Sequence, residues 1–95
     1  MTIAEHMRNV LLETDNAAVM SGDVYLLDDC ASRCTHTTLM EAHPLDRHKR
    51  ILDALDRSSL FEKYYVKVDL WNGRGYAERH VRYFKLLDKA IGDVV

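Results

Sequence analysis

The feature that most constrains this chain is a change of hydrophobic period near residue 63. Over residues 63–70, aromatic, β-branched and aliphatic side chains occupy every second position: Tyr64, Val66, Val68 and Leu70. Period two with such side chains predicts a β-strand. The pair Asn72-Gly73 follows, and Asn-Gly favours a two-residue type I′ turn because both positions need positive φ. We therefore expect a β-hairpin over about residues 62–81.

Such a turn determines which residues face each other across the two strands. The expected pairs are Lys67 with Glu78, Val68 with Ala77 and Val66 with Arg79. The first pair carries opposite charges and the second is small and apolar, and both kinds of pair stabilise antiparallel strands.

The same region also fits helical alternatives. One is a helix with the stripe Phe61, Tyr64, Tyr65, Val68 and Trp71, which would make the protein an all-α bundle. Another begins at Tyr76, because apolar residues then follow helical spacing: Ala77, Val81, Phe84, Leu87, Ile91 and Val94. We resolve the conflict with a short strand near residues 75–81 and a helix over about 83–91, capped by Gly92. A direct connection from strand through turn to helix stays open.

The N-terminal half predicts two helices. Thr2 and Glu5 match a capping box, and apolar residues then recur at helical spacing: Ile3, Met7, Val10, Leu11 and Ala18. We expect a first helix over about residues 3–20, ended by Ser21-Gly22-Asp23. Asp23 can cap a second helix, whose shared apolar face is Val24, Leu27, Ala31 and Cys34.

A third helix is expected after Pro44, because proline suits the first position of a helix. Before it, Thr38 and Glu41 match a second capping box around a short turn at residues 39–40. The apolar stripe of the third helix is Leu45, His48, Ile51, Leu52 and Leu55, and Ser58-Ser59 ends it.

Length and composition indicate one α+β domain over residues 1–95. The chain has 95 residues, of which 47% are hydrophobic, so one core is expected. It has no apolar run of the roughly 20 residues that a membrane helix needs, and its start lacks the pattern of a signal peptide. We expect a cytoplasmic protein without a membrane partner.

Charge is distributed unevenly along the chain. Residues 1–43 hold two basic and seven acidic residues, a balance of −5, whereas residues 44–88 hold ten and seven, a balance of +3. This polarity can orient the protein on an anionic partner, and it can equally support head-to-tail self-association.

Residues 24–85 resemble the winged helix-turn-helix family. The resemblance rests on Leu45 to Arg57 as the recognition helix, residues 58–63 as the link to the sheet, and Asn72-Gly73-Arg74-Gly75 as the tip of the wing. It implies a small winged helix-like fold and a regulator that places this helix in the DNA major groove. The acidic second helix and the missing glycine near residues 35–37 depart from that pattern.

The residues that this resemblance assigns to DNA are basic. Helix contacts fall to Arg47, Lys49 and Arg50, the wing tip to Arg74, and the flanks of the wing to Lys67, Arg79 and Arg82. The competing interpretation is an ordinary solvated helix face beside Asp46 and Asp53, with Lys67 paired to Glu78.

A second function class is a small protein-interaction module, such as an inhibitor or accessory subunit. Tyr65 and Trp71 lie at the polar-parity positions of the expected strand, where a two-layer domain leaves side chains in solvent, and interfaces favour such aromatics. The alternative is that the first or the last helix covers them. Homodimerisation through either helix would suit both functions.

Metal and catalytic signals are weak. Cys30, Cys34 and His36, with His43 and His48 downstream, supply zinc-ligand types, but the cysteines lie on a helical face that needs them for packing. We expect buried, reduced thiols, no metal and no cofactor, and a partly buried His48. The sequence contains no phosphate-binding loop, nucleophile motif or paired carboxylates, so we expect no enzymatic activity.

Overall fold

A computed structural model describes residues 2–34 and 39–87 of the chain. In order, its elements are α1 (Ile3–Glu13), β1 (Ala18–Met20), α2 (Val24–Arg33), the 3₁₀ turn η1 (Leu39–Glu41), α3 (Pro44–Asp56), β2 (Phe61–Trp71) and β3 (Tyr76–Leu86). The expected α+β class is confirmed, and the all-α alternative is wrong. The described part of the chain forms three α-helices and one antiparallel sheet of three strands, in the order β1-β3-β2.

Helix α1 begins as predicted but ends earlier. The amide of Glu5 donates to the Thr2 hydroxyl at 3.2 Å, and the amide of Thr2 donates to the Glu5 carboxylate at 2.9 Å, which completes the capping box. The predicted extension to residue 20 is wrong. Asp15 has a φ of 56°, and the amide of Asn16 reaches back to the carbonyl of Leu11 at 2.9 Å, so a left-handed C-cap stops the helix.

The residues after this cap form β1, which is the edge strand beside β3. Val19 lies opposite Phe84, and both side chains are fully buried. Ala18 and Val19 continue the helical spacing of α1, so the helical prediction failed because pairing with a strand distant in sequence overrides local pattern.

Helices α2 and α3 begin where predicted, with different caps. The Asp23 carboxylate accepts from the amide of Met20 at 2.8 Å and makes no cap bond to α2, while Gly22 takes a φ of 102° in the turn. Pro44 opens α3, and the ring of His43 accepts from the amide of Leu45. The capping box that involves Thr38 lies outside the described residues. Leu45 is not part of the buried stripe, because 72% of it is exposed.

The hairpin between β2 and β3 exists, but its turn has four residues. Asn72 donates its amide to the carbonyl of Gly75 at 3.0 Å, its side chain accepts from the amide of Arg74 at 2.9 Å, and Gly73 has a φ of 89°. Asn72 itself does not have positive φ, so a type I′ turn at Asn72-Gly73 is excluded.

The longer turn moves every predicted cross-strand pair by two residues. Lys67 faces His80, Val68 faces Arg79 and Val66 faces Val81, in place of Glu78, Ala77 and Arg79. A shift of two residues preserves which face of the sheet each side chain occupies.

Strand β3 is longer than predicted and replaces the start of the terminal helix. It runs to Leu86, with Phe84 and Leu86 buried and Lys85 exposed, which is the alternation of a strand. Residues 83–87 are therefore not helical, and residues 88–91 of the predicted helix lie outside the described residues. Phe84 has strand neighbours on both sides, so backbone pairing outcompetes the helical spacing.

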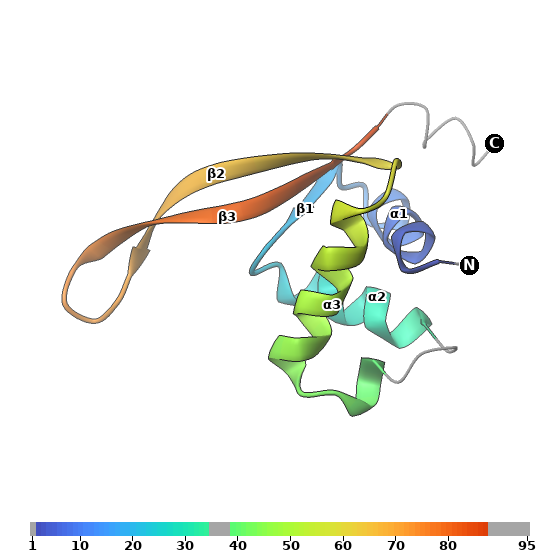
Figure 1. Cartoon of the computed structure of the whole chain (residues 1–95), viewed down its shortest axis with the longest axis horizontal. Coiled ribbons are helices and arrows are strands. Elements are labelled where there is room, and N and C mark those ends of the chain that lie inside the picture. Colours follow the sequence, from blue (N-terminus) through green and yellow to red (C-terminus); the bar gives the residue numbers. More distant parts are fainter. Residues whose placement is uncertain (1, 35–38, 88–95) are drawn as a thin grey trace.

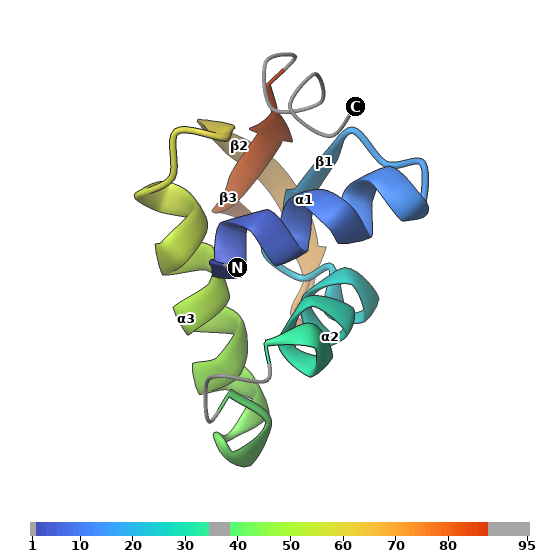
Figure 2. The same cartoon turned by 90° about the vertical axis from the view of Figure 1, so that its right-hand side faces the viewer.

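The core lies between the helices and one face of the sheet. Figures 1 and 2 show all three helices on the same side of the sheet. The fully buried side chains of this core include Met7, Val10, Leu11, Val19, Leu27, Cys30, Ile51, Leu55 and Phe84. Burial of this apolar surface supplies the main stabilisation of the domain.

The distal half of the hairpin projects beyond this core (Figure 1). We call the side toward the helices the helix-facing face; on it lie the odd-numbered residues of β2 and the even-numbered residues of β3, because Phe61 and Leu86 are buried in the core. The opposite side is the outer face. Toward the tip, Trp71 and Tyr76 on the first face and Leu70 on the second are all exposed.

Candidate nucleic-acid interface

The solvent side of α3 combines basic and acidic residues. Its buried residues Ile51, Leu52 and Leu55 pack inward. Helical spacing then leaves the other positions facing outward, among them Asp46, Lys49, Arg50, Asp53 and Arg57.

Arg47 does not belong to this solvent side. Its side chain is only 13% exposed, and its guanidinium donates to the backbone carbonyls of Leu39 at 3.0 Å and Ala42 at 3.2 Å. It also lies 3.6 Å from the Asp28 carboxylate. Arg47 therefore connects the turn η1 to α3, a role that the sequence analysis missed because it treated Arg47 as a surface cation.

His48 is partly buried, as expected, and has a specific partner. Its ring Nε2 lies 2.8 Å from Oδ1 of Asp28, and its side chain is 16% exposed. The Asp28 carboxylate of α2 thus contacts both His48 and Arg47 of α3. These contacts join the acidic side of α2 to α3.

Two ion pairs connect the base of the hairpin to α3. Arg82 of β3 contacts Asp53 at 2.7 Å, and Lys63 of β2 contacts Asp56 at 2.5 Å. The hydrogen bond from Arg82 lowers the pKa of the Asp53 carboxyl, and the bond to Asp56 raises the pKa of Lys63. Both predicted DNA contacts at Arg47 and Arg82 are thus side chains that already bind within the protein.

A groove of about 350 Å³ lies between the hairpin base, α3 and the turn after β1. The basic and imidazole groups of this groove come from Lys49, His48 and Arg82. Its apolar walls are formed by Val24, Leu27 and Leu52. Lys49 therefore lies beside the hairpin rather than apart from it, and this exposed cation of α3 and the base of the hairpin form one surface.

The remaining predicted cations lie on the hairpin. Lys67 is exposed on the helix-facing face opposite His80, and Arg74 is exposed in the turn. Arg79 is exposed on the outer face, opposite Val68. The predicted flanking pair Lys67 and Arg79 is therefore divided between the two faces of the hairpin.

An acidic pair interrupts this basic surface. Asp69 lies directly opposite Glu78 on the helix-facing face, between the Lys67 level and the tip. Like charges directly opposite each other destabilise a hairpin and repel phosphate. The sequence analysis missed this pair because its register placed Glu78 opposite Lys67.

Three aromatic side chains follow the helix-facing face of the hairpin. Tyr65 is 65% exposed, Trp71 64% and Tyr76 75%, and the Trp71 and Tyr76 rings meet edge to face at 5.4 Å. Tyr65 and Trp71 are exposed as expected, and no described helix covers them. The predicted parity is wrong, however, because these two residues share the helix-facing face with buried Phe61, and the alternate, apolar positions of β2 lie on the outer face. The sequence analysis did not identify Tyr76. With the correct loop length of four residues, Tyr76 is the first residue of β3 and lies opposite Trp71.

Nothing in the described residues indicates a metal or catalytic centre. Cys30 and Cys34 are buried, and the Cys34 thiol donates to the carbonyl of Cys30 at 3.1 Å. Burial raises the pKa of both thiols. His36 lies outside the described residues, and the described part of the chain holds no group of three or more residues of metal-ligand type.

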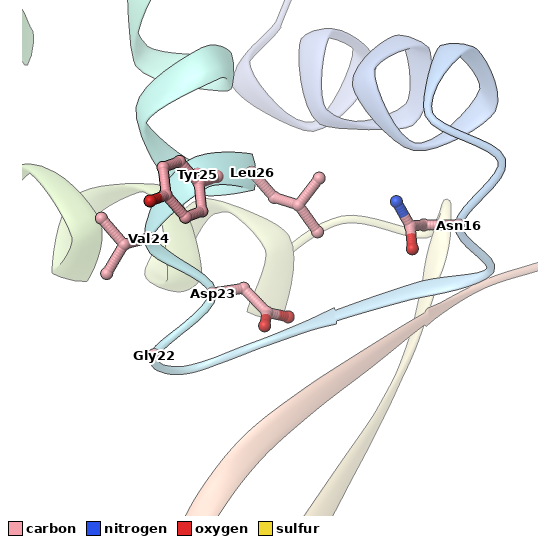
Figure 3. Close-up of a pocket in the computed structure, with 6 residues that line it drawn as sticks. All are labelled: Asn16, Gly22, Asp23, Val24, Tyr25 and Leu26. Carbon is pink, nitrogen blue, oxygen red and sulfur yellow. The ribbon is translucent and has the colours of Figure 1, made fainter.

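A hollow of about 400 Å³ beside the start of α2 is equally unlike an active site (Figure 3). The side chains of Asp23 and Asn16 are bound locally: the Asp23 carboxylate accepts from the amide of Met20, and the Asn16 amide donates to Thr14. Tyr25 at its edge is 91% exposed, so the hollow does not enclose a ligand.

Comparison of the chain with family models, curated proteins and solved structures found no match to any of them. Within residues 2–34 and 39–87, no helix is both long enough and apolar enough to cross a membrane.

Proposed function

We propose that this chain is a DNA-binding winged-helix domain, and that it acts as a non-catalytic regulator. In this proposal α3 enters the major groove and the β2–β3 hairpin is the wing. The observation that carries the proposal is the shared surface of α3 and the hairpin, where Lys49 lines one groove with Arg82. The order of elements, with a helix followed by a long hairpin, supports the winged-helix assignment.

The groups available to DNA are fewer than the sequence suggests. Five exposed cations remain on α3 and on the helix-facing side and tip of the hairpin: Lys49, Arg50, Arg57, Lys67 and Arg74. The Arg82–Asp53 and Lys63–Asp56 pairs hold the wing against α3, so the two contact surfaces are oriented before binding.

The test is fluorescence anisotropy of a labelled, mixed-sequence duplex over a series of salt concentrations. If all five cations reach phosphates, the logarithm of the binding constant falls against the logarithm of salt with a slope of about −4 to −5. Arg50→Ala and Arg74→Ala should each weaken binding and make the slope shallower by about 1.

Arg8→Ala is the matched control, because Arg8 lies on α1, which is at the opposite end of the molecule from the tip of the hairpin (Figure 1). It should leave both affinity and slope unchanged. Absence of binding at low salt would overturn the proposal, and equal effects of the three variants would remove Arg50 and Arg74 from the interface.

A second candidate is a protein-binding module that uses the exposed aromatics Tyr65, Trp71 and Tyr76. Their exposure favours it, since large aromatics in solvent are typical of interface centres. Trp71→Ala distinguishes the two candidates. Loss of a stoichiometric, nuclease-resistant protein partner in this variant, with DNA affinity unchanged, would favour the second candidate over DNA.

A further inference from the structure

Strand β2 forms one edge of the sheet, and no described element pairs with its free side. The Asn72 amide donates to the Gly75 carbonyl, and the Leu87 amide donates to the Leu60 carbonyl, so hydrogen-bonded pairs close both ends of the β2–β3 ladder. Such pairs alternate along antiparallel strands, which means that the even-numbered residues of β2 bond to β3. The odd-numbered residues over 63–71 are exposed and direct their amides and carbonyls away from the sheet. This edge is therefore open to a further strand.

The side chains along this edge are self-complementary. Residues 65–71 read Tyr-Val-Lys-Val-Asp-Leu-Trp, so aromatic, aliphatic and charged positions mirror one another about Val68, with a cation on one side and an anion on the other. If a second copy of this segment runs antiparallel, with Val68 opposite Val68, each copy's Lys67 faces the other's Asp69, and each Tyr65 faces the other's Trp71. Opposite charges and aromatic pairs stabilise antiparallel strands. A contact between two identical surfaces requires this two-fold pattern.

We infer that this chain forms a homodimer through the free edge of β2, in which two β2 strands pair antiparallel about Val68. The two three-stranded sheets then become one continuous sheet, with the described helices of both copies on the same face (Figures 1 and 2). Backbone hydrogen bonds form at four pairs, which are 65 with 71, 67 with 69 and their symmetry equivalents, and two bonds at each pair give about eight. Main-chain bonds provide the affinity of an added strand, and side chains provide its specificity.

The charges of the hairpin favour a second copy over an unrelated strand. Asp69 lies directly opposite Glu78, and Lys67 lies directly opposite His80. Neither carboxylate of the acidic pair forms an ion pair within the described part of the chain. In the dimer, the acidic pair of one copy continues into Lys67 and His80 of the other copy. The repulsion that destabilises a single hairpin is thereby offset, because the second copy supplies the missing cation.

Charge and shape together select the register. Moving the two-fold axis by one residue, to Lys67 or to Asp69, places a charged side chain opposite its own copy, which is unfavourable. Moving the axis to Val66 restores opposite charges, but it places the tip of each hairpin beside the other copy's connection from α3 to β2. The axis at Val68 pairs the distal part of each hairpin, which projects beyond the helices (Figure 1).

Sedimentation equilibrium of the full chain, without DNA, measures this dimer. We expect a dissociation constant between about 10 µM and 1 mM, as for small reversible interfaces. Lys67→Asp places like negative charges opposite each other twice, and Asp69→Lys places like positive charges opposite each other twice. Each variant should therefore self-associate at least about tenfold more weakly. An equimolar mixture of the two variants restores both opposite-charge pairs and should recover at least the wild-type affinity.

Arg79→Glu is the matched control. It makes the same change of net charge as Lys67→Asp, but it lies on the outer face of β3, away from the paired edge. By itself this variant should leave the dimer unchanged, and mixed with Asp69→Lys it should not restore association. Circular dichroism of each variant monitors folding. Recovery with Lys67→Asp alone therefore cannot come from weaker folding of one hairpin or from attraction between chains of opposite charge.

A disulfide tests the register directly. Val68 lies opposite its own copy at a pair without mutual hydrogen bonds, where the Cα atoms are about 4.5 Å apart, a separation that a disulfide spans. Val66 lies opposite Leu70, four residues and about 13 Å from its own copy. Under mild oxidation in a glutathione buffer, Val68→Cys should therefore form covalent dimers, and Val66→Cys should not. The native thiols Cys30 and Cys34 are buried and do not compete.

Three results would overturn the inference. One is a wild-type chain that stays monomeric at about 1 mM. Another is a mixture of Lys67→Asp and Asp69→Lys that associates no better than either variant alone. The third is a covalent dimer of Val66→Cys in place of Val68→Cys. If a cysteine variant does not fold, the mixture of charge variants decides. Because these experiments contain no DNA, their results are independent of the proposed function.

Discussion

Replacing Leu86 and Leu87 by alanine, one at a time, tests the decision between strand and helix at the end of the described chain. In the strand, Leu86 faces Phe61 and is 3% exposed, whereas Leu87 is half-buried. In the helix that the sequence suggested, Leu87 belongs to the apolar stripe and Leu86 does not. The two models therefore assign opposite ranks to two neighbouring leucines.

The magnitudes follow from burial. Leu86→Ala removes a fully packed side chain and should lower the free energy of unfolding by about 2–4 kcal/mol. Leu87→Ala removes a half-buried one and should cost about 1 kcal/mol. Neither substitution removes a backbone bond, because the amides of both residues keep their carbonyl acceptors, Ala17 and Leu60.

Urea unfolding followed by far-ultraviolet circular dichroism is the appropriate assay. Fluorescence is a poor probe of global unfolding here, since the single tryptophan, Trp71, is 64% exposed near the tip of the hairpin. An equal or larger loss of stability in Leu87→Ala than in Leu86→Ala would refute the strand assignment for residues 83–86 and restore the helical one.

Two further predictions concern titratable groups. The hydrogen bonds from Thr2 lower the pKa of Glu5, so its stabilising contribution is present above the unfolded-state value of about 4.5 and is lost as pH falls. The stability difference between wild type and Glu5→Gln, measured by thermal unfolding, should be largest above about pH 4.5 and should shrink as the pH falls below it; a difference that stays constant with pH would contradict the capping role. Cys30 and Cys34 are buried and burial raises the pKa of both thiols, so neither should react with a thiol reagent in native buffer, and both should react in urea. Rapid stoichiometric labelling of the native chain would show that these side chains are accessible.

Local sequence patterns were sufficient where short-range physics decides the outcome. Three features were predicted correctly: the capping box at Thr2, the start of α3 at Pro44 and the strand after residue 63. Each depends on residues within a few positions of one another. The exposure of Tyr65 and Trp71 was predicted correctly but for the wrong reason. Strand parity places both on the helix-facing face with buried Phe61, and they are exposed because the hairpin projects beyond the helices (Figure 1).

The failures have a common cause, which is competition from partners distant in sequence. Ala18 and Val19 continue the spacing of α1, yet they pair with β3 some 65 residues later. Residues 83–86 have helical spacing, yet they lie between two strands. The Asn-Gly pair alone also did not determine the length of the hairpin loop. The register was therefore predicted wrongly, and the opposition of Asp69 and Glu78 was not predicted.

The candidate site divides in the same way. That the second half of the chain carries the cations, and that α3 and a hairpin present them, followed from the sequence alone. Only the tertiary structure decided that Arg47 and Arg82 bind within the protein, while Lys49, Arg50 and Arg74 remain exposed. The physical reason is that a side chain's partners are set by which elements pack together, and neither charge nor spacing along the chain contains that information.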